Sequence, residues 1–162
     1  GFLRPALNFQ PPRSIQTMAL WHDELMLVTA GQEDPTVAAD PVHIDSLADD
    51  DFILFPSALG CGLFEHISSM ATAAGFVPRI VQQVRENSTT LALVAGGLGI
   101  SIVPSIYNKS SPPGVAFRKI AGAQVNSPIV MATMANRNIA SLQLFREYCL
   151  ERCSTQADSQ PG

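Results

Sequence analysis

Residues 85–107 have the sequence RENSTTLALVAGGLGISIVPSIY, and this stretch decides the fold. Polar Asn87 opens a short helix in which apolar residues recur at helical spacing. The glycines at 96–99 end that helix within one turn. The apolar strand Ile100–Val103 follows at once and stops at Pro104. A helix that passes directly into a fully apolar strand is typical of an open α/β sheet. Because the stretch contains no catalytic side chain, it favours a ligand-binding scaffold over a reaction site.

Strands and helices alternate on both sides of this stretch. The predicted strands lie at 1–4, 17–29 (two pieces around the polar break His22-Asp23-Glu24), 52–55, 80–84, 100–103, 115–120 and 128–133. The predicted helices lie at 44–48, 62–74, 88–96 and 138–151, and the tail from Ser154 to Gly162 is expected to be disordered. This order predicts an α/β fold with mostly parallel pairing and helices over the faces of the sheet.

Composition supports a folded domain with a core. Of 162 residues, 46% are hydrophobic and 15% are charged, which excludes global disorder. The net charge is −4 and the ten basic residues are scattered. Nucleic-acid affinity depends on clustered Lys and Arg, so this chain is not expected to bind a polyanion by itself.

The three cysteines, Cys61, Cys149 and Cys153, do not form a disulfide framework. Cys149 and Cys153 share a helix face, but no second pair of zinc ligands accompanies them. We interpret Cys149 and Cys153 as structural or incidental thiols, which fits a reducing cytoplasm. The Cys61 thiol, at a predicted helix N-terminus, could instead have a lowered pKa. The sequence shows no signal peptide and no membrane-spanning run of about 18 apolar residues. Because the chain starts at Gly1 rather than Met, we expect it to begin inside a larger protein.

A ligand in an open parallel sheet binds beyond the carboxyl ends of the strands. Three segments fall there: Pro56–Phe64, Glu86–Thr90 and Pro104–Tyr107. Two of them open helices, whose first turns offer free N–H groups to an anion. Gly60 and Gly62 allow close backbone approach. The alternative is that Ser57, Asn87 and Ser88 simply cap their own helices.

Catalytic and metal sites find little support in the sequence. His22, His43 and His66 have no metal-ligand spacing, and Ser57 lacks the Gly-x-Ser-x-Gly elbow. The glycines at 96–99 precede a strand, the reverse of a phosphate loop, and lack its lysine. Cys61 has no adjacent histidine in the sequence. We therefore expect no catalytic residue, no metal and no cofactor.

Several segments, in order, resemble the effector-binding domain of LysR-type transcriptional regulators, over about residues 1–150. The segments are Gly1–Pro5, Leu25–Val28 with Ala30-Gly31, Ile53–Pro56, Ala74–Pro78, Val84–Glu86 and, the most specific, Leu91–Pro104. One departure occurs in a loop, where Gln32–Pro35 replaces the usual His-Pro turn.

The resemblance implies a two-lobed, periplasmic-binding-protein-like (type 2) α/β domain. Lobe one would comprise residues 1–26 and 126–153, and lobe two residues 27–125. In the family, a DNA-binding helix-turn-helix and the first elements of lobe one precede the equivalent of Gly1. We therefore expect lobe one to be incomplete, with an open sheet edge, and DNA binding to need a helix-turn-helix domain absent from this chain.

By the same resemblance, a small effector binds between the lobes without being transformed. The matching positions are Phe2, Arg4, Ser57, Cys61, Gly62, Leu63, Phe64, Glu86 and Asn87. Arg4 is the natural bidentate partner for a carboxylate, although it could equally be a salt-bridged surface arginine. Phe2, Leu63 and Phe64 suggest an apolar or aromatic acid, although Phe64 could equally belong to the core.

The implied function is ligand sensing that controls transcription through a population shift. The full-length protein would be a cytoplasmic homo-oligomer, a dimer or tetramer, with no membrane partner. Two other functions share the scaffold. A solute-binding protein of a transporter would need an export signal, and free cysteines are unusual there. An enzyme would need an acid–base pair or a cofactor-bearing cysteine in the cleft.

Overall fold

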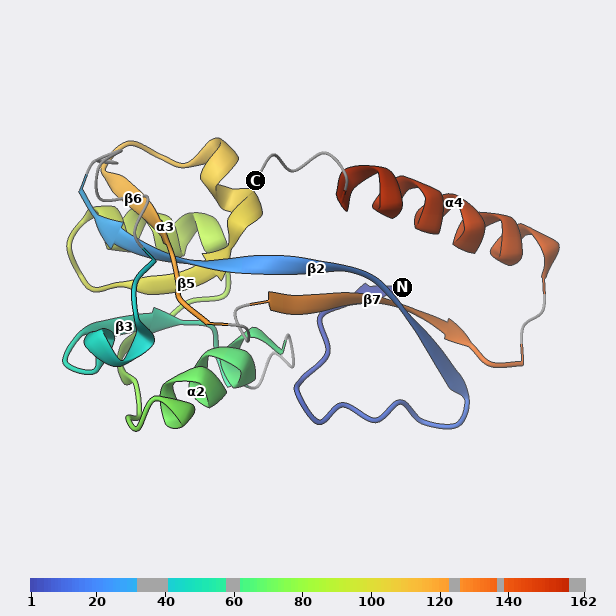
Figure 1. The fold of residues 1–162 in the computed structure, drawn as a ribbon, viewed down its shortest axis with the longest axis horizontal. Coiled ribbons are helices and arrows are strands. Elements are labelled where there is room, and N and C mark those ends of the chain that lie inside the picture. The colour runs from blue at the N-terminus through green and yellow to red at the C-terminus, as the bar shows by residue number, and fades with distance from the viewer. Residues whose placement is uncertain (32–40, 58–61, 123–125, 137–138, 158–162) are drawn as a thin grey trace.

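The computed structural model describes residues 1–31, 41–57, 62–122, 126–136 and 139–157. The strands are β1 (Phe2–Leu3), β2 (Ile15–Ala30), β3 (Asp51–Leu54), β4 (Arg79–Gln83), β5 (Ser101–Pro104), β6 (Val115–Lys119) and β7 (Asn126–Met134). The helices are α2 (Leu63–Ala73), α3 (Asn87–Ala95) and α4 (Ala140–Ala157), with short 3-10 helices η1 (Ile44–Leu47) and η3 (Ser105–Ser110). The architecture is mixed α/β, as predicted (Figure 1).

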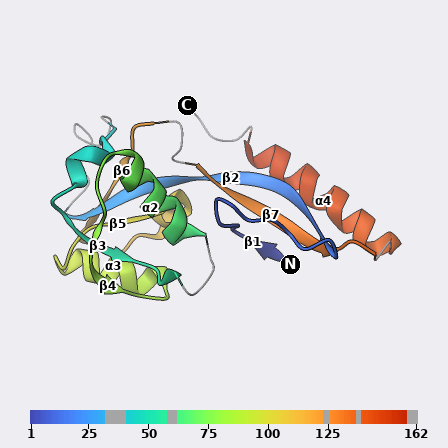
Figure 2. The same ribbon diagram turned by 90° about the horizontal axis from the view of Figure 1, so that it is seen from below.

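Strand β2 is long and extends from one half of the molecule into the other (Figures 1 and 2). Its first part pairs antiparallel with β7, ending at Glu24 opposite Asn126. From Leu25 onward it pairs with β5 on one side and β6 on the other. The sequence predicted two strand pieces separated at residues 22–24, which is wrong. The polar residues there are held in one continuous strand because β7 pairs with them.

The core lies on both faces of the second part of β2. Because strand side chains alternate, Leu25 and Leu27 enter one cluster while Met26 and Val28 enter another. The first cluster contains Leu63 and Ile67 of α2. The second cluster contains Leu91 and Val94 of α3. Helices on both faces explain why the run at 25–28 is apolar at every position.

The glycines at 96–99 end α3, as predicted, and one of them has a second role. Gly97 has φ +76°, and the N–H of Leu98 donates to the carbonyl of Leu93 at 3.1 Å, which is a Schellman ending. Gly99 lies against the main chain of Asp51, where an added Cβ would come within 2.4 Å of the carbonyl oxygen. Only glycine lets β5 begin this close to β3.

Parallel pairing is less extensive than predicted. Strands β3 and β4 are parallel, and isolated parallel bridges join Phe52 to Ile100 and Val42 to Ile120. The pairings of β2 with β5, β6 and β7, and of β1 with β7, are antiparallel. The share of parallel pairing is small because β2 runs antiparallel to each of its partners, β5, β6 and β7.

Helix α4 contacts β2 beside its pairing with β7 (Figure 1), and the ring centroids of Phe145 and Phe2 lie 6.2 Å apart in an edge-on arrangement. It continues to Ala157, whereas the sequence predicted an end near Glu151 and a disordered tail from Ser154. Residues 158–162 of that tail lie outside the described residues. None of the described helices is long and apolar enough to cross a membrane.

Candidate functional site

Three strand ends meet at one edge of the second half of the molecule. Strands β3 and β4 are parallel, so the turns that follow them lie at the same edge. Strand β5 runs the same way as β3, because Phe52 and Ile100 form a parallel bridge. At this edge Pro104 of β5 lies opposite Leu25 of β2. The three ends therefore lie along one edge, and the end of β5 adjoins the point where β2 changes its pairing partners.

Arg4 is fixed beside this point by both strands of the neighbouring pair. Its Nη2 lies 2.5 Å from the Asp23 Oδ2, and its Nη1 donates to the carbonyl of Ser127 at 3.3 Å. The Trp21 Nε1–H donates to the other Asp23 oxygen at 2.8 Å. The Arg4 side chain is only 11% exposed. Of the five N–H donors that a guanidinium carries, these bonds use two.

The main chain after β1 is pressed against the start of α2. Gly62, the N-cap of α2, has φ +69°. A Cβ at Gly62 would lie 2.3 Å from the Pro5 carbonyl oxygen and 2.8 Å from that of Arg4. The structure therefore brings the main chain of Arg4 and Pro5 against Gly62, and only glycine permits that approach.

The other residues predicted to contact a ligand differ in their burial. Leu63 is buried in the core, and Phe64 is partly buried against the same cluster. Ser57 is exposed, and Phe2 is 55% exposed with its ring against Phe145. Cys61 lies outside the described residues, as does Gly60. Leu63 and Phe64 thus have a packing role in the core.

The first turn of α3 has no side-chain cap. Its N-cap is Glu86, which makes no capping hydrogen bond, so the alternative that Asn87 and Ser88 cap this helix is wrong. The N-cap of α2 is Gly62, so Ser57 does not cap α2 either. The Asn87 Oδ1 is buried and has no hydrogen-bond partner. Two first turns without a side-chain cap, plus this oxygen, therefore flank the edge described above.

His66 lies one turn into α2 and is 6% exposed. Burial lowers the pKa of its imidazole, and the nearby positive charge of Arg4 lowers it further. Hydrogen bonding to the Pro5 backbone and the charge of Glu65 act in the opposite direction. The lowering prevails, so His66 is neutral at pH 7, and its Nε2 is buried with no partner.

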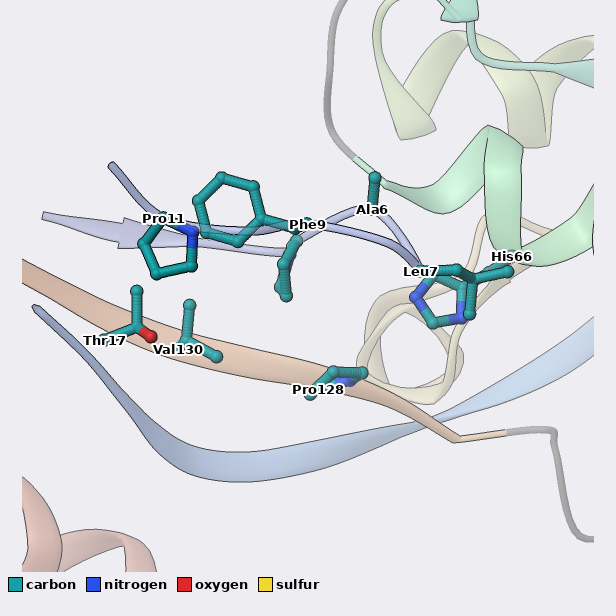
Figure 3. Close-up of a pocket in the computed structure, with 9 residues that line it drawn as sticks. Ala6, Leu7, Phe9, Pro11, Thr17, His66, Pro128 and Val130 are labelled. Atoms are coloured by element: carbon teal, nitrogen blue, oxygen red, sulfur yellow. The ribbon is translucent and has the colours of Figure 1, made fainter. Parts of the chain in front are cut away.

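A cavity of about 320 Å³ lies beside His66 (Figure 3). Its lining residues are Pro5, Ala6, Leu7, Phe9, Pro11, Thr17, His66, Pro128 and Val130. None of the eight predicted site residues that the structure describes is among them. The cavity is thus adjacent to the Arg4 centre but has walls of its own.

Metal ligands do not gather in the part of the chain that the structure describes, where no three His, Cys, Asp or Glu side chains form a group able to hold an ion. Cys149 and Cys153 are free thiols on α4. Burial, and then the neighbouring Cys149, raise the pKa of Cys153.

Sequence reasoning missed three residues of this region. Asp23 holds Arg4, and Trp21 in turn donates to Asp23; the available signal was the polar break at residues 22–24 inside an apolar strand. His66 was considered only as a metal ligand. Its place on the apolar face of α2, in register with buried Leu63 and Met70, was the signal of a buried imidazole.

Comparison with known proteins places the chain in a family. The family model described as the LysR substrate binding domain matches residues 1–154. The chain is 32% identical over 110 residues to the uncharacterized HTH-type transcriptional regulator YnfL of Escherichia coli, covering 67% of this chain and 35% of that protein. It is 27% identical over 111 residues to the HTH-type transcriptional regulator XapR of the same organism, covering 68% and 37%. The chain thus spans about a third of these curated relatives.

Solved structures share the fold. The effector binding domain of BenM with benzoate superposes with a TM-score of 0.83 at 23% identity, covering 99% of this chain and 72% of that one. The effector binding domain of QuiR with shikimate gives 0.77 at 23% identity, covering 95% and 71%. Full-length CbnR with its target DNA gives 0.80 at 24% identity, covering 94% and 51%. The chain belongs to the LysR substrate-binding domain family and has its periplasmic-binding-protein-like fold.

Proposed function

We propose that this chain is the ligand-sensing part of a LysR-type transcriptional regulator and holds a small carboxylic acid at the Arg4 centre. The ligand would lie between lobe one, residues 1–26 and 126–153, and lobe two, residues 27–125. The change of pairing partners in β2 at Glu24 and Leu25 supports a division near this boundary. The ligand is bound and released unchanged.

The position of Arg4 carries the proposal. Its guanidinium is mostly buried, yet it retains donors beyond those taken by Asp23 and Ser127. Its backbone contacts the start of α2, where N–H groups have no side-chain cap. A carboxylate placed there would gain charge-assisted hydrogen bonds from Arg4 and from a helix N-terminus together. Few other small groups match both donors.

The ligand class follows from this donor set. The benzoate bound by BenM and the shikimate bound by QuiR are both carboxylates. We propose the same headgroup for this chain, with an apolar or aromatic body beside the partly buried Phe64. The predicted contacts Leu63 and Phe2 pack instead in the core and against Phe145. Ser57, Cys61, Glu86 and Asn87 complete the proposed contact set at the strand ends.

Control of transcription would follow from a shift between conformations. A ligand that contacts both lobes favours the orientation in which both sets of contacts form. The CbnR structure contains DNA, and we propose that a helix-turn-helix domain contacts DNA in the longer protein to which this chain corresponds. Oligomeric assembly would pass the change in orientation to the DNA-binding domains. A cytoplasmic location follows from this role.

Calorimetric titration with small carboxylic acids, benzoate and shikimate first, tests the proposal. We expect saturable binding that weakens about tenfold to a hundredfold in Arg4→Gln, the cost of losing a charged bidentate partner. The matched control is Arg79→Gln, because Arg79 is 65% exposed, pairs with Asp51 and begins β4 at the opposite edge. This control should bind like the wild type.

Two results would overturn the proposal. One is equal binding by wild type and Arg4→Gln, which would move the ligand away from Arg4. The other is conversion of a bound acid, followed by NMR of the ligand over a day, which would favour an enzyme on this scaffold.

A further inference from the structure

We propose that the cavity beside His66 is a second ligand site, for a neutral and mainly apolar molecule carrying one hydroxyl group. Its simplest occupant is a phenol. This site is separate from the carboxylate site proposed at Arg4 and does not depend on it. The proposal rests on where the cavity lies, what lines it, and an unpartnered buried atom of one lining residue, His66.

The cavity lies on the face of the sheet opposite α4. Phe2 meets Phe145 of α4, and Phe2 and Met18 both lie opposite Met131. Because residues directly opposite each other share a face, these three point toward α4. Val130 is the next residue along β7 and so points the other way, into the cavity. Residues 5–11 cross over this second face (Figure 3).

The lining selects an apolar ligand without charge. Seven of the nine lining residues are apolar, and none carries a carboxylate, ammonium or guanidinium group. A carboxylate buried here would lose its hydration without gaining a cation. The volume of about 320 Å³ is at the small end of the range for ligand pockets. A single substituted aromatic ring suits both properties.

His66 supplies the polar contact. It lines the cavity and is only 6% exposed, and its Nε2 has no hydrogen-bond partner. Solvent does not reach this atom, so water does not take the place of a partner. A hydroxyl group both donates and accepts, so it pairs with the neutral imidazole in either tautomer.

Leu7 is a lining residue of the same cavity and is 50% exposed. We take it to cover the His66 Nε2, which solvent does not reach. Leu7 belongs to the segment between β1 and β2, which has no regular secondary structure. Displacing this side chain would open a path to Nε2 without disturbing the sheet or α2.

The test compares p-cresol with toluene, which has the same ring and methyl group but no hydroxyl. Binding is followed by 15N NMR of the imidazoles and by methyl shifts of Leu7 and Val130, with the His66 signals assigned by their loss in His66→Phe. We expect p-cresol to bind saturably, to shift the His66 Nε2 signal, and to bind roughly fivefold or more tightly than toluene. His66→Phe should remove that preference.

A blocking variant keeps the test decisive if His66→Phe fails to fold. Leu7→Trp should fill the cavity and abolish p-cresol binding, while Leu98→Trp, at an exposed leucine outside the cavity, should not. The proposal is overturned if p-cresol does not saturate, if wild type binds toluene equally well, or if Leu7→Trp leaves binding intact. Competition between p-cresol and benzoate that Arg4→Gln removes would also overturn it, by showing a single site at Arg4.

Discussion

The substitution Gly62→Ala tests whether the main chain after β1 is pressed against α2. An added Cβ would approach the Pro5 carbonyl oxygen to 2.3 Å, far inside ordinary van der Waals contact. The obstacle is backbone, so rotation of a side chain does not relieve it. The φ of +69° adds a conformational penalty for any residue with a Cβ. Both costs fall on the contact that joins Arg4 to the start of α2.

Gly97→Ala is the matched control. Gly97 has nearly the same conformation, φ +76°, but no atom lies within 4 Å of an added Cβ. Its replacement should cost about 1 kcal/mol of unfolding free energy, for conformation alone. Gly62→Ala should cost that amount plus about 1–3 kcal/mol for forced movement of the backbone.

Urea unfolding of the two variants and the wild type measures both values. The expected difference between Gly62→Ala and Gly97→Ala is about 2 kcal/mol, with unchanged denaturant dependence. Gly62→Ala should also weaken carboxylate binding, because Arg4 moves with Pro5. Equal costs in the two variants would refute the close contact, and with it the geometry proposed for the site.

Three further substitutions or conditions have defined outcomes. Asp23→Asn removes a negative charge and keeps one acceptor oxygen toward Arg4, at the cost of the Trp21 hydrogen bond, so calorimetry should show carboxylate affinity rising several-fold; a fall would mean that the charge itself orients Arg4. Phe52→Ala empties a fully buried core position and should cost about 3–5 kcal/mol in urea unfolding; a cost below 1 kcal/mol would contradict that burial. Burial lowers the pKa of His66 below 6.5, so the unfolded chain binds more protons, and stability that is complete above pH 6.5 should fall as the pH drops toward the folded-state pKa. The urea midpoint should rise with pH across this range, and it should rise less steeply in His66→Phe than in the wild type. An equal dependence on pH in the two proteins would contradict the lowered pKa of His66.

Local sequence features were sufficient for most of the fold. The helix and strand periods placed α2, α3 and β3–β6 within one or two residues, because caps, glycine endings and apolar runs act over a few positions. Pairing direction was less predictable. Strand β2 pairs with β7, more than a hundred residues away in sequence, and that partner keeps the polar residues at 22–24 in a strand. Nothing local to those residues indicates it.

The candidate site was predictable in part for the same reason. Strand ends and helix starts identified the turns near Gly62 and Asn87, and the resemblance to a family added Arg4. The groups that hold Arg4 were not found, because Asp23 and Ser127 reach it only through the pairing of β2 with β7. A long-range contact of this kind leaves no periodic signal in the sequence.

A crystal structure of the chain with its tightest-binding carboxylic acid tests the central claim most directly. The account predicts the carboxylate within about 3 Å of the Arg4 guanidinium and of N–H groups in the first turn of α2. An acid bound elsewhere, with Arg4 still contacting only Asp23 and Ser127, would contradict it.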